Sequence, residues 1–339
     1  MSVVIPVRDE IARIPAVIAN VAAQTLRPYE VIVVDGASTD GTREWLAERA
    51  RAEDGWLVVV PNERRIIPVA LNLGIAAARG DLVARMDAHA DYPADYLERL
   101  AGLLAERPEV SGAGSAMTTA GRGAWGRAIA AVLSRRIGLG GARHRVGGHG
   151  GPIEHVFTGC YRRSVLESAG GYDERLLANE DYEMDYRIRA AGGTLWLHPP
   201  ARSTWYVRNT PAATARQMFK YGFYKALTLR LHPAALRPRQ LAPPALVVAL
   251  AALAALSPVL TGYPVAAVAA GYLAACAVAG ARAARADGAS AWRGAVVPPV
   301  VHLSWGAGVL IGGVRFLGTR PAVARRGAGV PAPSHGNRS

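Results

Sequence analysis

The chain has 339 residues, a formal net charge of +13 and a hydrophobic content of 51%. This length suits one large domain with an appendage. Two cysteines are too few for a disulfide framework, so a reducing compartment is expected. Asp287 is the only acidic residue after Gln240, whereas the other 25 of the 26 acidic residues precede it. This distribution excludes one uniform soluble domain and predicts two regions in different solvents.

The N-terminal part alternates between strand-like and helix-like patterns. Short apolar runs predict strands, and apolar residues three or four positions apart predict helices. The predicted strands are residues 2–7, 29–38, 56–61 and 81–91, and the predicted helices are residues 10–24, 42–52 and 68–80. This alternation indicates an α/β domain with a mixed, mainly parallel sheet. The first strand begins without the basic flank or cleavage site of a signal peptide, so residues 1–240 are expected in the cytoplasm.

Carboxylates follow two of the predicted strands. Asp35 ends the second strand, and Asp87, His89 and Asp91 alternate at the end of the fourth. Turn capping explains each of them singly but not their coincidence, and open α/β sheets bind ligands outside the carboxyl ends of their strands. The sequence contains neither a phosphate-binding glycine-lysine loop nor a dinucleotide fingerprint. Phosphate chemistry at this edge would therefore depend on a metal and basic side chains.

Two later segments complete the N-terminal region. Residues 121–152 are rich in glycine and basic residues, and we expect a mobile loop there. Residues 176–193, LLANEDYEMDYRIRAAGG, predict a helix that begins near Glu180 and Asp181. Acidic residues there would complement the helix dipole, although more of them follow than that role requires.

Apolar segments dominate the C-terminal region. Residues 241–280 contain no charge, and two spans of about 20 residues fit, at about 241–260 and 263–281. The alternative, a pair of soluble core helices, is disfavoured because such helices rarely lack a charged face. The basic segment 229–240 reads as a cytoplasmic flank that attracts anionic membrane lipids. Nucleic-acid binding is disfavoured, since the basic residues lie beside apolar spans without interleaved aromatic residues.

A third apolar segment, 294–314, is a weaker span because it contains Pro298, Pro299 and His302. If it crossed the membrane, the tail 318–339 would lie outside, yet that tail has several arginines and no acidic residue. The positive-inside rule places such a tail in the cytoplasm. We therefore predict a cytoplasmic C-terminus, with residues 294–314 re-entrant or lying at the membrane interface.

Three motifs carry a resemblance to a known family. They are VIPVRDE near the N-terminus, VVDGASTDGT around residue 35, and MDAHA followed by YP around residue 87. With them, residues 1–225 resemble the family-2 inverting glycosyltransferases, which implies a GT-A-type nucleotide-sugar-binding domain. The MDAHA stretch is most similar to bacterial exopolysaccharide glucosyltransferases of the succinoglycan type. The donor-binding residues that the resemblance implies are Pro6, Glu10, Asp35, Asp40, Asp87, Gln217, Lys220 and Tyr221.

The resemblance also implies a metal site and a general base. Asp87 and His89 stand where the family has D-x-D, so an imidazole replaces the second carboxylate. Both ligands suit Mn²⁺, and Mg²⁺ accepts the nitrogen less readily, which leaves Mn²⁺ or Mg²⁺ as the metal. Asp181 would be the base and Glu180 its orienting neighbour. Gln217, Lys220 and Tyr221 match the Q-x-x-R-W spacing of processive members, with Lys in place of Arg and Tyr in place of Trp.

The implied protein is a membrane-anchored inverting glycosyltransferase of the bacterial cytoplasmic membrane. Its expected parts are a cytoplasmic GT-A domain, a basic juxtamembrane segment, multi-pass membrane segments and a basic flexible tail, at residues 1–228, 229–240, 241–317 and 318–339. The expected partners are a nucleotide-diphosphate sugar, with UDP-glucose favoured, and a polyprenyl-linked saccharide used for exopolysaccharide or another envelope glycan. The sequence leaves the oligomeric state unknown.

Three alternatives stay open. In the first, the enzyme transfers the sugar to a bare polyprenyl phosphate. In the second, the enzyme is processive, although the membrane portion is short for a translocation channel. A catalytically silent membrane scaffold is the third alternative. Retention of Asp35, Asp87 and Asp181 argues against this last one.

Overall fold

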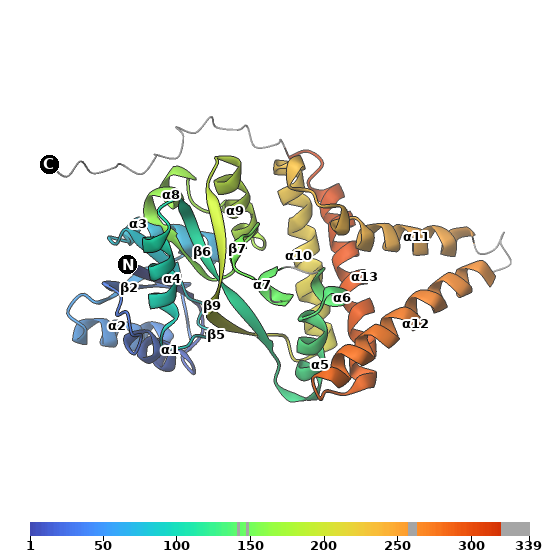
Figure 1. The fold of residues 1–339 in the computed structure, drawn as a ribbon, viewed down its shortest axis with the longest axis horizontal. Coiled ribbons are helices and arrows are strands. Elements are labelled where there is room, and N and C mark those ends of the chain that lie inside the picture. The colour runs from blue at the N-terminus through green and yellow to red at the C-terminus, as the bar shows by residue number, and fades with distance from the viewer. Residues whose placement is uncertain (141–142, 147–148, 257–262, 320–339) are drawn as a thin grey trace. The chain divides into compact units, whose positions relative to one another are not determined.

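The computed structural model describes residues 1–140, 143–146, 149–256 and 263–319. Its elements are drawn in Figure 1. The chain divides into two compact units, and the division falls within two long strands. The first unit contains Met1–Met117 and Gly147–Thr204, and the second contains Thr118–Val146 and Trp205–Val323. Residues 118–146 and 205–228, expected in the catalytic domain, thus group with the apolar helices.

A mixed sheet forms the centre of the first unit. Its strands are β1 (Ser2–Val7), β2 (Glu30–Asp35), β3 (Leu57–Pro61), β4 (Leu82–Arg85), β5 (Ala90–Asp91), β6 (Val110–Ala120), β7 (Gly151–Pro152), β8 (Gly159–Arg162) and β9 (Thr194–Tyr206). Their order is β3-β2-β1-β4-β8-β6-β9-β5, with β7 paired to β9. The first four are parallel, and β8 runs antiparallel to both β4 and β6. A parallel half is thus joined to an antiparallel half.

Helices cover both faces of this sheet. They are α1 (Ile14–Ala22), α2 (Thr42–Ala52), α3 (Ile67–Ala77), α4 (Tyr96–Glu106), α8 (Arg163–Ser168) and α9 (Glu180–Ala190). Val3 and Ile5 of β1 pack in a core with α1, α2 and α4, whereas Val4 packs in a second core with α3, α8 and α9. Alternate side chains of a strand point to opposite faces. Each buried aliphatic side chain contributes about 1.5–3 kcal/mol, so two cores hold the sheet rigid beneath its carboxyl edge.

The predicted strand 81–91 is two strands separated by a turn. β4 ends at Arg85, and the backbone N–H of Met86 makes the last contact with β1, donating to the carbonyl of Val4 at 3.1 Å. The N–H of Ala90 then donates to the carbonyl of Asp87 at 3.2 Å. The chain therefore leaves the sheet before Asp87, and the turn presents Asp87 and His89 beyond the strand end.

The second unit is helical in its described residues apart from the strand ends. Its elements are α5 (Gly123–Leu133), α6 (Arg136–Leu139), α7 (Arg143–Val146), α10 (Pro211–Leu231), η1 (Pro233–Ala235), η2 (Pro238–Gln240), α11 (Ala242–Leu256), α12 (Tyr263–Ala286) and α13 (Ala291–Arg315). The prediction of a loop over 121–152 is wrong for α5. Its alanine-rich sequence favours a helix, and α5 packs against α12 and α13.

Within the part of the chain that the structure describes, three helices are long and apolar enough to cross a membrane, by length and composition. They are Pro238–Leu256, Ala266–Ala286 and Ala291–Arg315. The last is one unbroken helix with Pro298 and Pro299 inside it, so the re-entrant turn predicted at these prolines is absent. Helices in membranes tolerate internal proline where neighbours satisfy the freed backbone groups. The interfacial alternative for this segment remains a prediction.

Glycines bring α13 close to α10. A Cβ atom on Gly308 would overlap the carbonyl oxygen of Phe219, and one on Gly312 would overlap that of Phe223. Small residues four positions apart let helix backbones approach closely in membranes. Beyond the helix, the Arg230 side chain donates to the Thr319 carbonyl at 2.8 Å. The C-terminal half of α13 thus runs alongside α10.

Candidate active site

The loops that follow β1 and β2 are joined by hydrogen bonds. The Asp40 carboxylate accepts from the backbone N–H of Ile11 at 3.0 Å, and from the N–H and hydroxyl of Thr42 at 3.0 and 2.5 Å. The N–H of Glu10 donates to the Thr42 hydroxyl at 2.9 Å. The Thr42 hydrogen bond is the main cause that lowers the pKa of Asp40. Asp40 therefore braces the loop that carries Glu10.

Asp35 lies at the carboxyl end of β2, opposite Val7 in the parallel register. Its side chain is 1% exposed and accepts from Arg43 Nε at 2.9 Å. Pro6 is one position earlier, paired with Val34 within the sheet. A buried aspartate oriented by an arginine is a fixed acceptor for N–H or O–H groups of a ligand. Pro6 instead shapes the strand that precedes the loop.

Asp87 is buried beside an arginine that the sequence prediction did not include. Arg85 Nε donates to Asp87 Oδ1 at 2.8 Å, and the backbone N–H of Asp87 donates to the Tyr92 hydroxyl, also at 2.8 Å. Burial alone would raise the pKa of Asp87, but Arg85 and His89 outweigh it and lower that pKa. Asp87 is therefore an ionised carboxylate inside the protein.

Arg85 also reaches the start of α9. Its Nη1 lies 3.4 Å from Glu180 Oε1, so one guanidinium joins Asp87 to Glu180. Burial, with the charge of Asp181, raises the pKa of Glu180 to about 7, and Arg85 opposes this shift. One indication of this role is present in the sequence: Arg85 is a charged residue at the end of a buried strand, two positions before Asp87. The sequence did not indicate that Arg85 contacts Glu180.

Asp181 occupies the first turn of α9 and is partly open to solvent. Its side chain is 25% exposed, and its Oδ1 accepts from the backbone N of Tyr182 at 2.7 Å. Asn179, just before the helix, adopts a left-handed conformation with φ of 61°. The turn leaves Glu180 buried against Arg85 and Asp181 accessible. A solvent-accessible carboxylate beside a buried one suits a base that must meet a second substrate.

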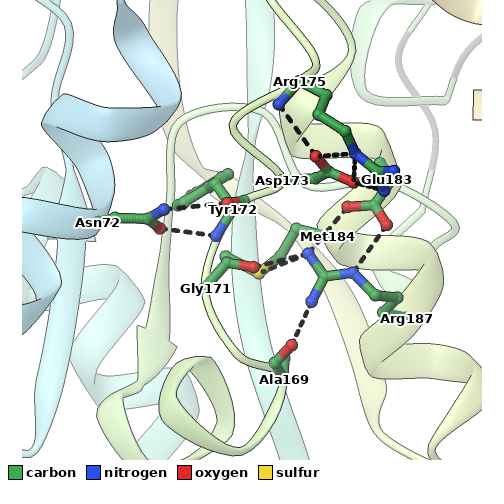
Figure 2. A network of polar contacts seen from close by, with 9 residues as sticks. All are labelled: Asn72, Ala169, Gly171, Tyr172, Asp173, Arg175, Glu183, Met184 and Arg187. Carbon is green, nitrogen blue, oxygen red and sulfur yellow. Dashed lines mark hydrogen bonds and ion pairs between the residues drawn. The ribbon is translucent and has the colours of Figure 1, made fainter. Parts of the chain in front are cut away.

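A polar network holds the start of α9 in place (Figure 2). Arg187, on α9, donates to the carbonyls of Ala169 and Gly171 and pairs with Glu183 at 2.7 Å. Asn72, on α3, donates to the carbonyl of Tyr172 at 2.9 Å and accepts from its N–H at 2.7 Å. The loop before α9 is thereby tied to α9 itself and to α3.

The other predicted donor-binding residues lie in the second unit. Gln217, Lys220 and Tyr221 are on α10, where Gln217 Nε2 donates to the Tyr221 hydroxyl at 3.0 Å. Residues four apart share a helix face, so the Q-x-x-K-Y spacing presents Gln217 and Tyr221 together. Their contribution to the first unit's site stays a prediction.

The metal donors are few. Among the described residues, no three His, Cys, Asp or Glu side chains come together as a metal cluster. The protein's contribution would be the buried Asp87 and the exposed His89, two residues further along the same turn. Arg85 contacts both Asp87 oxygens, at 2.8 and 3.4 Å. An ionised carboxylate has about four lone-pair sites, so some remain for a cation. Divalent metals that bind phosphates take few protein ligands, and the donor set fits one.

A mixed sheet with buried carboxylates at its carboxyl edge, and an acidic pair at a helix start joined to it by Arg85, is the arrangement that the resemblance to GT-A glycosyltransferases predicts. The chain belongs to glycosyltransferase family 2: the profile of "Glycosyl transferase family 2" matches residues 2–170. The chain is 36% identical to the succinoglycan biosynthesis protein ExoA of Rhizobium meliloti over 248 residues, which are 71% of this chain and 73% of ExoA.

Two further similarities bear on the fold and the chemistry. The chain is 30% identical to the undecaprenyl-phosphate 4-deoxy-4-formamido-L-arabinose transferase of Pseudomonas aeruginosa over 205 residues, 56% of this chain and 57% of that protein. It resembles the solved mannosyltransferase PcManGT from Pyrobaculum calidifontis, in complex with GDP-Man and Mn²⁺, with a TM-score of 0.64 and 24% identity over 93% of this chain and 86% of that one. The GT-A fold is therefore shown.

Proposed function

We propose that this membrane protein is an inverting hexosyltransferase that moves a sugar, with glucose favoured, from a UDP-sugar to a polyprenyl-linked saccharide. The product would serve exopolysaccharide or another envelope glycan. The observation that carries the proposal is the bridge from Asp87 through Arg85 to Glu180, which fixes the acidic pair beside the strand end. The similarity to ExoA supports the choice of pathway class.

Each residue has one role in this proposal. Asp35 receives hydrogen bonds from the donor's base or ribose. A divalent metal held by Asp87 and His89 would neutralise the donor's diphosphate. Asp181 takes the proton from the acceptor hydroxyl as it attacks the anomeric carbon, opposite the leaving diphosphate. Glu180, bound by Arg85, orients Asp181, and Lys220 would meet the leaving diphosphate as a point charge.

A second candidate is transfer to a bare polyprenyl phosphate. The 30% identity to the undecaprenyl-phosphate transferase favours it. The two candidates share the donor site and differ in the acceptor. A sugar hydroxyl must lose a proton to Asp181 when it attacks, whereas an ionised phosphate oxygen has no proton to lose.

The test is to incubate membranes containing the full chain with a panel of nucleotide sugars and to identify lipid-linked products by mass spectrometry. Membranes from cells that lack the protein give the background. A hexose added to a lipid-linked saccharide supports the proposal, and a polyprenyl phosphate that carries one hexose supports the second candidate. No product above background with any donor would contradict both.

His89→Asp would restore two carboxylates at the metal position. We expect the variant to keep transfer activity and to shift its preference from Mn²⁺ toward Mg²⁺, because Mg²⁺ favours oxygen over nitrogen ligands. Activity measured across titrations of each metal checks this. His149→Asp, at another exposed histidine, is the control. An unchanged metal preference would show that His89 does not bind the metal.

We also propose that the protein is multi-pass in the cytoplasmic membrane, with its catalytic unit and C-terminus in the cytoplasm. The contact between Arg230 and Thr319 supports this, because it places the end of α13 beside the basic segment 229–240. His302 of α13 also lies 2.7 Å from the Ile137 carbonyl of α6. Contacts with short, non-spanning elements favour α13 at the membrane interface.

A single thiol in the tail checks this orientation. In a Ser334→Cys variant whose native thiols are removed by Cys160→Ala and Cys276→Ala, we expect no labelling by an impermeant thiol reagent in intact cells. Labelling should appear after permeabilisation. Ser334 lies outside the described residues, and a cysteine-free variant is the control. Labelling in intact cells would instead mean that α13 spans the membrane.

A further inference from the structure

A histidine lies between two carboxylates of α9. His155 Nδ1 is 2.8 Å from Asp185 Oδ2, and His155 Nε2 is 3.7 Å from Asp181 Oδ2. Asp181 and Asp185 are four residues apart, so they occupy one face of the helix. The histidine comes from the segment before β8, and its side chain is 17% exposed. One imidazole therefore connects a buried aspartate to the accessible one.

Asp185 determines which ring nitrogen of His155 carries the hydrogen and which one faces Asp181. The Asp185 carboxylate is fully buried and also accepts from the backbone N of Val156 at 2.7 Å and from the Tyr161 hydroxyl at 2.8 Å. Burial raises the pKa of Asp185, and the three donors oppose that shift because they stabilise the ionised form. The carboxylate held by these donors is the acceptor in its contact with His155, so Nδ1 carries the hydrogen. The nitrogen that faces Asp181 is then Nε2. A second carboxylate that fixes a histidine in this way sets its tautomer and ring orientation.

Asp181 lies between a second carboxylate and this histidine. On one side it adjoins Glu180, whose pKa burial and the charge of Asp181 raise to about 7. Two adjacent carboxylates disfavour ionisation of both. A base must be ionised to accept a proton. Arg85 contacts Glu180, the neighbour of the base. On the other side of Asp181 lies His155, and an imidazolium there favours the ionised carboxylate.

We propose that His155, fixed by Asp185, is the positioning residue that holds the base Asp181 ionised and aimed at the acceptor. This inference rests on the proposed function, because it assigns a role within the same site. His155 acts through Asp181 and does not touch the sugar. Its distance of 3.7 Å from Asp181 is that of an ion pair, and the role needs charge and orientation and no further proton transfer.

The groups that affect this ion pair come from several elements. On α9 they are Asp181, Asp185, Glu180 and Tyr182, whose ring centre is 6.0 Å from that of His155. Tyr161 of β8, Tyr172 of the loop before α9 and Arg85 of β4 interact electrostatically with Asp181. Both tyrosines have a pKa raised by burial. They stay neutral near pH 7, so the titration belongs to the histidine and the carboxylates.

The first experiment does not depend on transfer. The full chain in detergent, labelled with ¹⁵N-histidine, is titrated by NMR, and the His155 signals are identified by their loss in His155→Asn. We expect protonation at Nδ1 throughout, and a histidine pKa that falls by about one unit in Asp181→Asn because one facing anion is gone. Asp185→Asn should disturb the tautomer. His198→Asn, at a half-buried histidine on β9, is the control and should leave the His155 signals unchanged.

The second experiment uses the pH profile of transfer. His155→Asn places an amide near the Nδ1 position and keeps a partner for Asp185. His155→Gln places an amide near the Nε2 position and still orients Asp181. Both remove the charge, so we expect the rising limb of kcat/KM against pH to move about one unit higher in each. We expect Gln to retain more activity than Asn at high pH. KM for the donor should stay unchanged, since the donor does not contact His155.

The outcomes separate this inference from the proposed function. If no donor is transferred but the NMR titration shows the coupling between His155 and Asp181, the proposed function fails and the assignment of the pair stands. The inference is overturned if transfer occurs and the rising limb of kcat/KM lies at the same pH in both His155 variants as in the unmodified protein. It is also overturned if Asp181→Asn leaves the histidine pKa measured by NMR unchanged. A loss of activity with an unshifted limb would show a merely structural histidine.

Discussion

Asp181→Asn should lower the transfer rate by on the order of 10² to 10⁴ while donor binding survives. The amide keeps the shape of the side chain and can still accept the N–H of Tyr182, which the carboxylate accepts at 2.7 Å. It cannot take a proton from the acceptor hydroxyl. Initial rates with the donor found in the membrane assay, together with nucleotide-diphosphate binding by calorimetry, measure the two effects separately.

Asp81→Asn is the matched control, because Asp81 is an exposed aspartate in the same unit. It should keep nearly full activity. If Asp181→Asn retained more than about half of the wild-type rate, the base would have to be another residue. Glu180 would then be the first candidate, since its raised pKa of about 7 lets it exchange protons near neutral pH.

Asp87→Ala should abolish metal-dependent donor binding and also destabilise the protein. The donor's diphosphate loses the carboxylate that holds its cation. Arg85, whose side chain is 13% exposed, loses the partner at 2.8 Å and keeps Glu180 at 3.4 Å. Removing one partner of a buried ion pair costs about 3–5 kcal/mol of unfolding free energy. Donor binding and a thermal unfolding curve, measured on the same sample, check both effects.

Asp87→Asn separates the two effects. Its amide oxygen still accepts from Arg85, so the fold should lose less stability while donor binding remains weak. Asp81→Ala, at an exposed aspartate before β4, is the control for the alanine variant and should bind donor normally. If Asp87→Ala bound the nucleotide sugar and the metal as tightly as the unmodified protein, Asp87 would have no part in the metal site and its role would be to neutralise Arg85.

The parallel half of the sheet could be predicted from the sequence because each of its elements has its own local pattern of residues. Residues 2–7 and 42–52 form β1 and α2 with the predicted bounds, since an apolar run and an amphipathic repeat each specify their own element. The carboxylates at strand ends followed from the same pattern. The helix α5 was missed because glycine and arginine residues concealed a short apolar repeat in a segment that reads as a loop.

The antiparallel half depends on contacts between distant residues. β8 lies between β4 and β6, a placement that no local repeat encodes. The same holds for the unbroken helix α13, where neighbouring helices accommodate two prolines that indicated a break in the sequence. In both cases the packing of other elements overrides the local preference of the chain.

The sequence by itself determined the family, the strand ends that carry Asp35 and Asp87, the acidic pair at the start of α9 and the apolar C-terminal helices. Each of these depends on residue type and short-range spacing. Only the tertiary structure decided that Arg85 joins Asp87 to Glu180, and that His155 joins Asp181 to Asp185 across 30 residues of sequence. Burial makes these charges interact strongly, and burial is a property of the folded chain.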